Sequence, residues 1–355
     1  MARSEQVRSV VSQIIDPLLE RSLAELRFIG DVAATPEKVS VAITLPTPAY
    51  PAAEQLKTLV SQSVTPLLDE GQSLEVSVSS SVRGKDAGGR VGLKIHNIIA
   101  VGSGKGGVGK STVAAALACG LHAMGCRVGL MDADVYGPSI PHMLGASGRP
   151  AATELMDEHG NKAVRMEPID VNGLKLMSMG FFIEQGQSVV WRGPMLHKAL
   201  TQFLKDTLWG ELDYLIIDLP PGTGDVSLTL SQQVGLAGAV IVCTPQQVAL
   251  LDAIKAVDMY QKVNVPVLGF VENMSGEVFG RGGAKKVADE LKVPFLGEVP
   301  MNGCIREYCD RGAMMQLLTE ENPSRQDLLQ VCQNVAMQVV KELVRSPSGP
   351  VLEIL

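Results

Sequence analysis

A glycine- and lysine-rich turn between a strand and a helix constrains the fold of this chain more than any other feature. The run Gly104–Ser111 reads Gly-Lys-Gly-Gly-Val-Gly-Lys-Ser, follows the apolar segment Ile98–Val101 and opens a helical pattern over Ser111–Met124. Glycines let backbone N–H groups turn inward toward phosphate oxygens, and a helix N-terminus adds partial positive charge there. A glycine-rich turn with a chance lysine is the alternative, but the complete spacing in this context favours phosphate binding.

Individual residues of this loop have predicted tasks. Lys110 places its charge at the β- and γ-phosphates of a nucleotide, and the Ser111 hydroxyl is suited to ligate Mg²⁺. Lys105 is either a solvated surface lysine or a charge that reaches a phosphate across a dimer interface. The residues predicted to bind the nucleotide from this loop are Gly104, Lys105, Gly106, Gly107, Val108, Gly109, Lys110, Ser111 and Thr112.

Three aspartates follow predicted strands. Asp132 and Asp134 come directly after the apolar run 128–131, and Asp218 ends another apolar run. Ligands of parallel sheets bind at the carboxyl ends of the strands, so a carboxylate at Asp218 can hold Mg²⁺ through water. Aspartates at such positions also cap helices. Three of them beside a phosphate loop favour a functional role.

Short apolar runs alternate with helical patterns from His96 onward. Buried apolar strands separated by helices indicate a parallel sheet covered on both faces. Strands are predicted at Ile98–Val101, Val128–Met131, Tyr214–Ile217, Ala239–Val242, Val267–Val271 and Phe295–Leu296. Helices are predicted at Ser111–Met124, Met195–Leu208, Gln247–Val263, Ala284–Leu291 and Ser324–Val344. The predicted fold class is α/β, a P-loop NTPase with a mostly parallel sheet sandwiched by helices, preceded by a small α/β domain.

The smaller domain is predicted from the first 82 residues. Apolar residues recur at helical spacing over 7–15 and 56–64, and they alternate with polar residues over 39–45 and 74–78. The segment 83–95 is rich in glycine and charge, which is typical of a linker. The predicted domains are therefore 1–82, a linker at 83–95, and an ATPase domain at 96–355.

Composition excludes several classes of function. The chain has 31 Lys and Arg against 38 Asp and Glu, a net charge of −7, and its aromatic content is 4%. This balance argues against nucleic-acid binding, and few aromatic rings are present to stack on bases. No run of about 18 apolar residues predicts a membrane span, and the first 16 residues lack the apolar core of a secretory signal. Six cysteines are too few for a disulfide scaffold, so we expect a cytoplasmic location.

Several segments together carry a family resemblance. They are the loop Gly104–Ser111, Asp132–Ser139, Asp218–Asp225, Trp191–Met195, Glu272–Ser275 and Phe279–Gly283. Residues 96–345 thereby resemble the Mrp/ApbC family, deviant P-loop ATPases of the MinD/ParA-like superfamily that carry iron–sulfur clusters. Residues 1–82 resemble the PaaD-like (MIP18-type) domain that is often fused ahead of this ATPase.

The resemblance implies an ATP-dependent homodimer that passes clusters to apo iron–sulfur proteins or assembly factors. By that analogy Lys105 and Lys110 contact phosphates, and Asp134 positions or activates the attacking water. Asp218 holds Mg²⁺ through water with Ser111 as direct ligand, and Asp132 supports the outer shell of the metal. Asn273 reads the adenine, since an amide offers a donor and an acceptor side by side. Slow ATP hydrolysis is the expected activity, with ATP and Mg²⁺ as cofactors.

Two departures from the family pattern concern the cluster. The family carries Cys-x-x-Cys soon after the segment that ends at Ser275, where a pair of subunits would hold a [4Fe–4S] cluster, and this chain has no cysteine there. Tyr50 stands where the N-terminal domain usually has a cysteine. Cys304 and Cys309 are the weak remaining candidates for cluster ligands, because side chains five residues apart on a helix diverge by about 140°.

Two other functions remain open. One is a cluster-free adaptor whose ATPase acts as a switch on client proteins. The other is a positioning ATPase like MinD or ParA, which needs a basic amphipathic helix for a membrane or a basic patch for DNA. The C-terminal tail instead contains Pro347 and Pro350 and no basic cluster. The sequence favours the cluster-carrier ATPase and predicts neither nucleic acid nor membrane as a partner.

Overall fold

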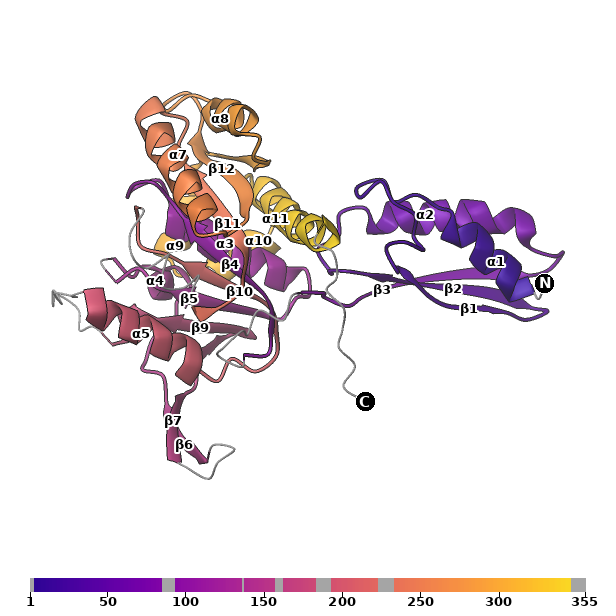
Figure 1. Cartoon of the computed structure of the whole chain (residues 1–355), viewed down its shortest axis with the longest axis horizontal. Helices are drawn as coiled ribbons and strands as arrows, with labels where there is room; N and C mark the ends of the chain where they lie inside the picture. Colours follow the sequence, from indigo (N-terminus) through magenta and orange to yellow (C-terminus); the bar gives the residue numbers. More distant parts are fainter. Residues whose placement is uncertain are drawn as a thin grey trace. The chain divides into compact units, whose positions relative to one another are not determined.

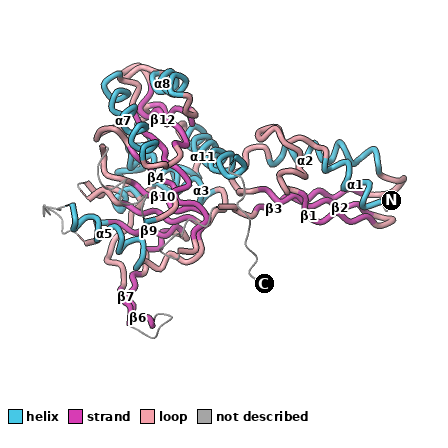
Figure 2. The backbone as a smooth tube through the Cα atoms, viewed as in Figure 1, coloured by secondary structure: helices cyan, strands magenta, loops and turns pink. Residues whose placement is uncertain are grey.

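The computed structural model describes residues 3–84, 93–135, 137–156, 162–182, 193–222 and 233–345, which pack as two units (Figures 1 and 2). One unit is the chain up to Arg83 together with the residues from Val340 onward. The other unit is Gly84–Val339.

The N-terminal unit contains a three-stranded sheet with two helices on one face (Figure 1). The strands are β1 (Ile29–Ala34), β2 (Lys38–Leu45) and β3 (Ser73–Ser80), and the helices are α1 (Arg3–Ser12) and α2 (Ala53–Val64). β2 pairs with β1 antiparallel and with β3 parallel. Alternate residues of β2, from Val39 to Leu45, are buried, as the period of a strand that is covered on one face requires.

The larger unit is built on an eight-stranded sheet. Its strands lie in the order β13-β12-β11-β4-β10-β5-β9-β8, and every pair is parallel except β8 with β9. The strands are β4 (Ile95–Gly102), β5 (Val128–Asp132), β8 (Ile169–Val171), β9 (Leu174–Ser178), β10 (Leu212–Asp218), β11 (Leu236–Cys243), β12 (Val267–Ser275) and β13 (Phe295–Pro300). A separate hairpin is formed by β6 (Ala152–Met156) and β7 (Lys162–Met166).

Helices cover both faces of this sheet. One apolar core joins alternate strand residues such as Ile98 and Ala100 to α5 (Gly193–Asp206), α7 (Gln247–Lys262) and α8 (Gly283–Leu291). The opposite face is covered by α3 (Lys110–Ala123), which packs against α10 (Met314–Thr319) and α11 (Arg325–Arg345). Two further helices, α4 (Ile140–Met143) and α9 (Gly303–Asp310), contact each other.

The predicted α/β class, a mostly parallel sheet covered by helices after a small α/β unit, is confirmed. All six strands and all five helices predicted for the larger unit are present. The sequence did not predict the hairpin of β6 and β7, β1, β8, β9, α4, α9 or α10, which are mostly short. Most of the predicted linker, residues 85–92, lies outside the described residues. Within the described ranges, no helix is both long and apolar enough to cross a membrane.

Candidate functional site

The loop after β4 has the backbone shape of a phosphate cradle. β4 ends at Gly102 and α3 begins at Lys110. Gly107 and Gly109 have φ angles of +81° and +79°, a region that side chains with a Cβ disfavour. A Cβ at Gly109 would also collide with the amide nitrogen of Asn273. Both the backbone angle and the contact with Asn273 therefore favour glycine at Gly109.

A cavity of about 230 Å³ lies inside this loop. Its lining consists of Ser103, Lys105, Gly106, Gly107, Gly109, Lys110, Ser111, Thr112, Asp134, Ser139 and Pro221. The structure thus brings most of the predicted loop residues and Asp134 to one cavity. Ser139 and Pro221 are additions that the sequence did not single out, although both lie in segments that carry the family resemblance.

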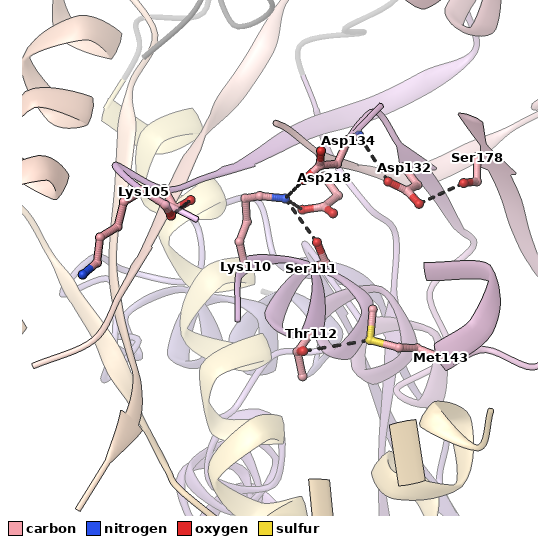
Figure 3. A network of polar contacts seen from close by, with 10 residues as sticks. Lys105, Lys110, Ser111, Thr112, Asp132, Asp134, Met143, Ser178 and Asp218 are labelled. Carbon is pink, nitrogen blue, oxygen red and sulfur yellow. Dashed lines mark hydrogen bonds and ion pairs between the residues drawn. The ribbon is translucent and has the colours of Figure 1, made fainter. Parts of the chain in front are cut away.

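Lys110 lies at the floor of the cavity among three polar side chains (Figure 3). Its Nζ is 2.6 Å from Oδ1 of Asp218, 3.2 Å from Oγ of Ser111 and 3.5 Å from Oδ2 of Asp134. Lys110 is 5% exposed and Asp218 is fully buried. A phosphate that enters the cavity must therefore compete with carboxylates for this ammonium group.

The carboxylates of Asp132 and Asp218 are buried and lie close enough to affect each other electrostatically. Burial raises the pKa of Asp218, and Lys110 opposes that rise. Burial, followed by the charge of Asp218, raises the pKa of Asp132 to about 7. Closely spaced carboxylates of this kind are stabilised by a cation.

One oxygen of this cluster suits a metal ion. Oδ2 of Asp218 is buried and has no hydrogen-bond partner among the described residues. A hydroxyl at Ser111 lies beside the same Lys110 ammonium group as Asp218. Carboxylate and hydroxyl oxygens are ligands that Mg²⁺ accepts, so the residues present fit that ion.

Asp132 is held from two sides. Its Oδ2 accepts a hydrogen bond of 2.8 Å from Oγ of Ser178, and its Oδ1 accepts one of 3.2 Å from the backbone N–H of Asp134 (Figure 3). Ser178 was not predicted as a site residue, because it belongs to no motif of the sequence. It is found only through the pairing of β5 with β9, where Asp132 lies opposite Ser178.

Lys105 stands apart from this cluster. Its side chain extends away from Lys110 and the aspartates in Figure 3, although Lys105 is among the residues that line the cavity. The backbone carbonyl of Lys105 accepts a hydrogen bond of 2.9 Å from the Ser103 hydroxyl, which fixes the loop but leaves the ammonium group outside. The structure therefore does not bring Lys105 and Lys110 to the same point of the cavity.

Asn273 braces the phosphate loop from β12. Its Nδ2 donates a hydrogen bond of 2.9 Å to the carbonyl of Val108. A second cavity of about 280 Å³ adjoins it. That cavity is lined by Thr112, Asn273, Met274, Pro300, Met301, Asn302, Ile305, Arg306, Cys309 and Asp310. Asn273 and Thr112 thus lie where the phosphate loop meets a mainly apolar hollow.

The neighbouring Glu272 has hydrogen-bond partners that the sequence did not predict. It is fully buried, and its two oxygens accept hydrogen bonds of 2.7 Å from the N–H groups of Gly282 and Ala284. These N–H groups lie at the start of α8, where backbone donors lack helical partners. Glu272 therefore ties the end of β12 to the beginning of α8.

Cys304 and Cys309 both lie on α9, the arrangement in which their side chains diverge. Sγ of Cys304 is 3.3 Å from the Ser324 hydroxyl, whereas Cys309 lines the second cavity. Burial raises the pKa of Cys309 to about 11, which disfavours the thiolate that iron requires. Over the described ranges, no group of three or more Cys, His, Asp or Glu side chains is arranged to hold a metal ion, so neither cysteine has the further ligands that a cluster needs; the Mg²⁺ fit above rests on an Asp218 oxygen and the Ser111 hydroxyl. The residues described here do not fit an iron–sulfur cluster within one chain.

Tyr50 occupies the other position where the family has a cysteine. Its hydroxyl donates a hydrogen bond of 2.7 Å to Oδ2 of Asp16, and both residues are buried. Oδ1 of Asp16 accepts two more from the N–H groups of Leu18 and Leu19. Burial, followed by the bond to Asp16, raises the pKa of Tyr50. The position is a closed hydrogen-bonded contact and fits no metal ligand.

Some residues of the segments that carry the family resemblance lie outside the described residues. They are Tyr136, Trp191, Arg192 and Thr223–Asp225.

Two family models match the chain. One is described as an iron-transfer P-loop NTPase of the NUBPL type and matches residues 94–336. The other is described as an iron–sulfur cluster assembly protein and matches residues 4–78. An iron–sulfur cluster carrier protein of Deinococcus radiodurans is 44% identical over 354 residues, which cover 96% of this chain and 98% of that protein.

Solved structures resemble the larger unit. A nucleotide-binding protein of Archaeoglobus fulgidus, determined in complex with ADP, is 37% identical, with a TM-score of 0.54 over 66% of this chain and 92% of that one. The cell division ATPase MinD of Pyrococcus furiosus is 22% identical, with a TM-score of 0.51 over 67% of this chain and 98% of that one. The second likeness shows a shared fold alone.

Proposed function

Because this chain belongs to the NUBPL family of iron-transfer P-loop NTPases, we propose that it is an ATP-dependent iron–sulfur cluster carrier or assembly factor. It binds ATP with Mg²⁺, hydrolyses ATP slowly as a homodimer and transfers clusters to apoproteins or assembly factors. The observation that carries the nucleotide part is the Lys110 ammonium group, 2.6 Å from Asp218 on the floor of a glycine-lined cavity.

The charges of the site suggest how nucleotide binding proceeds. Triphosphate oxygens attract Lys110 away from Asp218, because a phosphate carries more negative charge than one carboxylate. The Ser111 hydroxyl would then be free to ligate Mg²⁺ directly and Asp218 to hold it through water, and the ion would neutralise charge on the phosphates. Asp132, which is held by its bonds to Ser178 and Asp134, would support the outer shell of that metal.

Two further residues complete the proposed catalytic set. Asp134 lines the phosphate cavity and is suited to position or activate the attacking water. Lys105, directed away from its own cavity, is suited to reach the nucleotide of the partner copy. In this scheme the complete active site needs two copies of the chain.

The second cavity is the proposed seat of the base. Asn273 lies between it and the phosphate loop, so a nucleotide whose phosphates occupy the loop can extend its base into it. Asn273 has already committed one amide hydrogen to Val108. Its remaining donor and its acceptor are the groups proposed to read adenine.

A cluster-free adaptor is the second candidate, and a specific observation favours it. The loop after Ser275 has no cysteine and is closed by two backbone hydrogen bonds between Gly276 and Gly280. Tyr50 likewise lies in a closed contact with Asp16. In this reading ATP switches the binding of client proteins, and no cluster is held. All six cysteines are free thiols, in keeping with a reducing cytoplasmic setting for either function.

Anaerobic reconstitution with iron and sulfide separates the two. Iron, sulfide and protein are counted after desalting for the wild-type chain and for the double variant Cys304→Ser/Cys309→Ser, together with phosphate release from ATP. About four iron atoms per dimer, lost in the double variant, support carriage at α9. Iron retained in the variant points to other ligands. ATP turnover without stable iron supports the adaptor, and failure to bind ATP contradicts both readings.

A further inference from the structure

The corner where β9 ends lies directly behind the strand-end aspartates. Ser178 is the last residue of β9 and is fully buried. Its hydroxyl donates to Asp132 at 2.8 Å and accepts a hydrogen bond of 2.9 Å from the N–H of Gly180. With donor and acceptor both engaged, the Ser178 hydroxyl has one orientation, and it fixes the plane of the Asp132 carboxylate.

That carboxylate transmits the constraint to the next aspartate. The other oxygen of Asp132 accepts the backbone N–H of Asp134, so one carboxylate joins the Ser178 hydroxyl to the main chain of Asp134 (Figure 3). Asp134 turns its own carboxylate into the phosphate cavity, 3.5 Å from Nζ of Lys110. The position of the Asp134 side chain therefore depends on how Asp132 is held.

The turn after β9 also packs against Pro138, in the segment that follows β5. A Cβ at Gly180 would lie 3.2 Å from Cβ of Pro138 and 3.2 Å from Oγ of Ser178, so the backbone of Gly180 packs closely on Pro138. Ser139, the next residue, lines the phosphate cavity. Ser178 thus contacts the end of β5 at Asp132, and Gly180, two residues later, packs on Pro138 in the segment after β5.

We propose that Ser178, with Gly180, positions Asp132, Asp134 and Ser139 for hydrolysis of the bound nucleotide, an inference that rests on the proposed ATPase function. Ser178 is a positioning residue, because it contacts Asp132 and not the cavity. The simpler view is that Ser178 only caps the turn Met179–Phe181. Capping accounts for the hydrogen bond that Ser178 accepts from Gly180. It does not account for the hydrogen bond that Ser178 donates to Asp132.

The test compares kcat with KM for ATP in three full-length variants. Ser178→Ala removes the hydroxyl, and we expect kcat to fall about tenfold while KM and the affinity for a non-hydrolysable ATP analogue stay within about twofold. Ser178→Thr keeps a hydroxyl and should recover most of kcat. Gly180→Ala perturbs the same turn in a different way, because its Cβ crowds Pro138 and Ser178. It should also lower kcat with little change in KM.

A matched control removes a different buried hydroxyl. Oγ1 of Thr207 is buried without a hydrogen-bond partner among the described residues, and Thr207 contributes nothing to either cavity. Thr207→Val should leave both kcat and KM unchanged. Thermal melting of every variant shows how much of any effect comes from lost stability.

The outcomes separate this inference from the proposed function. A wild-type chain that releases no phosphate from ATP contradicts the proposed function itself. A wild-type chain that hydrolyses ATP while Ser178→Ala keeps its kcat overturns the role of Ser178 alone. The same holds if Ser178→Ala loses nucleotide affinity and kcat in equal measure, or if Ser178→Thr recovers stability without recovering kcat.

Discussion

The ammonium group of Lys110 lies 2.6 Å from a carboxylate oxygen of Asp218, and these two buried side chains neutralise each other under the phosphate loop. The residue predicted to contact phosphate and the residue predicted to hold the metal are therefore coupled. A change in either one alters the charge balance of the other.

Replacing Lys110 with alanine should abolish nucleotide binding. The triphosphate loses its only buried cationic partner among the described residues of the cavity, so we expect the affinity for ATP to fall at least about 100-fold. Equilibrium binding of a fluorescent ATP analogue measures it. Unchanged affinity would refute the assignment of this cavity.

The same variant should also lose stability, because Asp218 keeps a buried charge without its partner. Breaking such a pair costs about 3–5 kcal/mol. Burial already raises the pKa of Asp218, so the folded variant takes up a proton there before the unfolded chain does as pH falls. The deficit should therefore shrink toward acidic pH. The double variant Lys110→Ala/Asp218→Asn should regain stability at neutral pH without regaining ATP binding.

Replacing Asp134 with alanine should leave ATP bound but not hydrolysed. The phosphate loop and Lys110 remain, whereas the carboxylate proposed to position water is lost, so we expect turnover to fall about 100-fold or more. Asp258→Ala serves as the control, since Asp258 pairs with exposed Lys262 on α7. Phosphate release under saturating ATP is the measurement, and normal release would show that water is activated elsewhere.

Mixing two inactive variants tests whether Lys105 acts on the partner copy. Lys105→Ala and Asp134→Ala should each be inactive as pure dimers. In a mixed dimer, one site has its own Asp134 and receives Lys105 from the other chain, so ATP turnover should reappear. No recovery on mixing would place Lys105 in its own site or outside the chemistry.

Replacing Tyr50 with phenylalanine should destabilise the N-terminal unit. The change removes a donor from the buried carboxylate of Asp16, at an expected cost of about 1–3 kcal/mol. Tyr308→Phe removes a bond of 2.8 Å, to Glu320, at an exposed site and should have little effect. Denaturant unfolding compares the pair. Equal losses in both variants would show that burial of the Asp16 contact has no consequence.

Replacing Glu272 with glutamine should destabilise the start of α8. A carboxylate accepts from both Gly282 and Ala284, whereas an amide must turn a donor toward one of these N–H groups. We expect a loss of about 2 kcal/mol or more. Glu298→Gln is the control, since Glu298 is partly exposed and pairs with exposed Arg281. Hydrogen exchange of the α8 amides reports where stability is lost.

The phosphate loop was predictable because one short segment combines a buried strand, glycines and a helix start. Asp218 was predictable for a related reason, since a charged residue that ends an apolar run marks the carboxyl end of a strand. Only the structure shows that Asp218 contacts Lys110. That contact joins residues 108 positions apart, and no local pattern encodes it.

The end of β12 and the role of Ser178 in β9 could not be predicted from a local sequence pattern. β12 was predicted to end at Val271 but continues to Ser275, because Glu272 and Asn273 are buried polar residues whose partners lie elsewhere in the chain. β9 is short, and its last residue Ser178 gains its role only from lying opposite Asp132 in the sheet. Hydrogen-bond partners decided these positions, and hydrophobic periodicity does not report them.

The bond from Asn273 to the Val108 carbonyl has a consequence for engineering the nucleotide preference of this chain. A substitution of Asn273 that is meant to favour another base would also remove this hydrogen bond and loosen the phosphate loop. The selectivity for the base and the affinity for the nucleotide would therefore change together. Met301 and Ile305 line the cavity that is proposed to hold the base, and neither lines the phosphate cavity. A designer who wants a chain that accepts a bulky synthetic purine should therefore enlarge the hollow at those two positions and leave Asn273 intact.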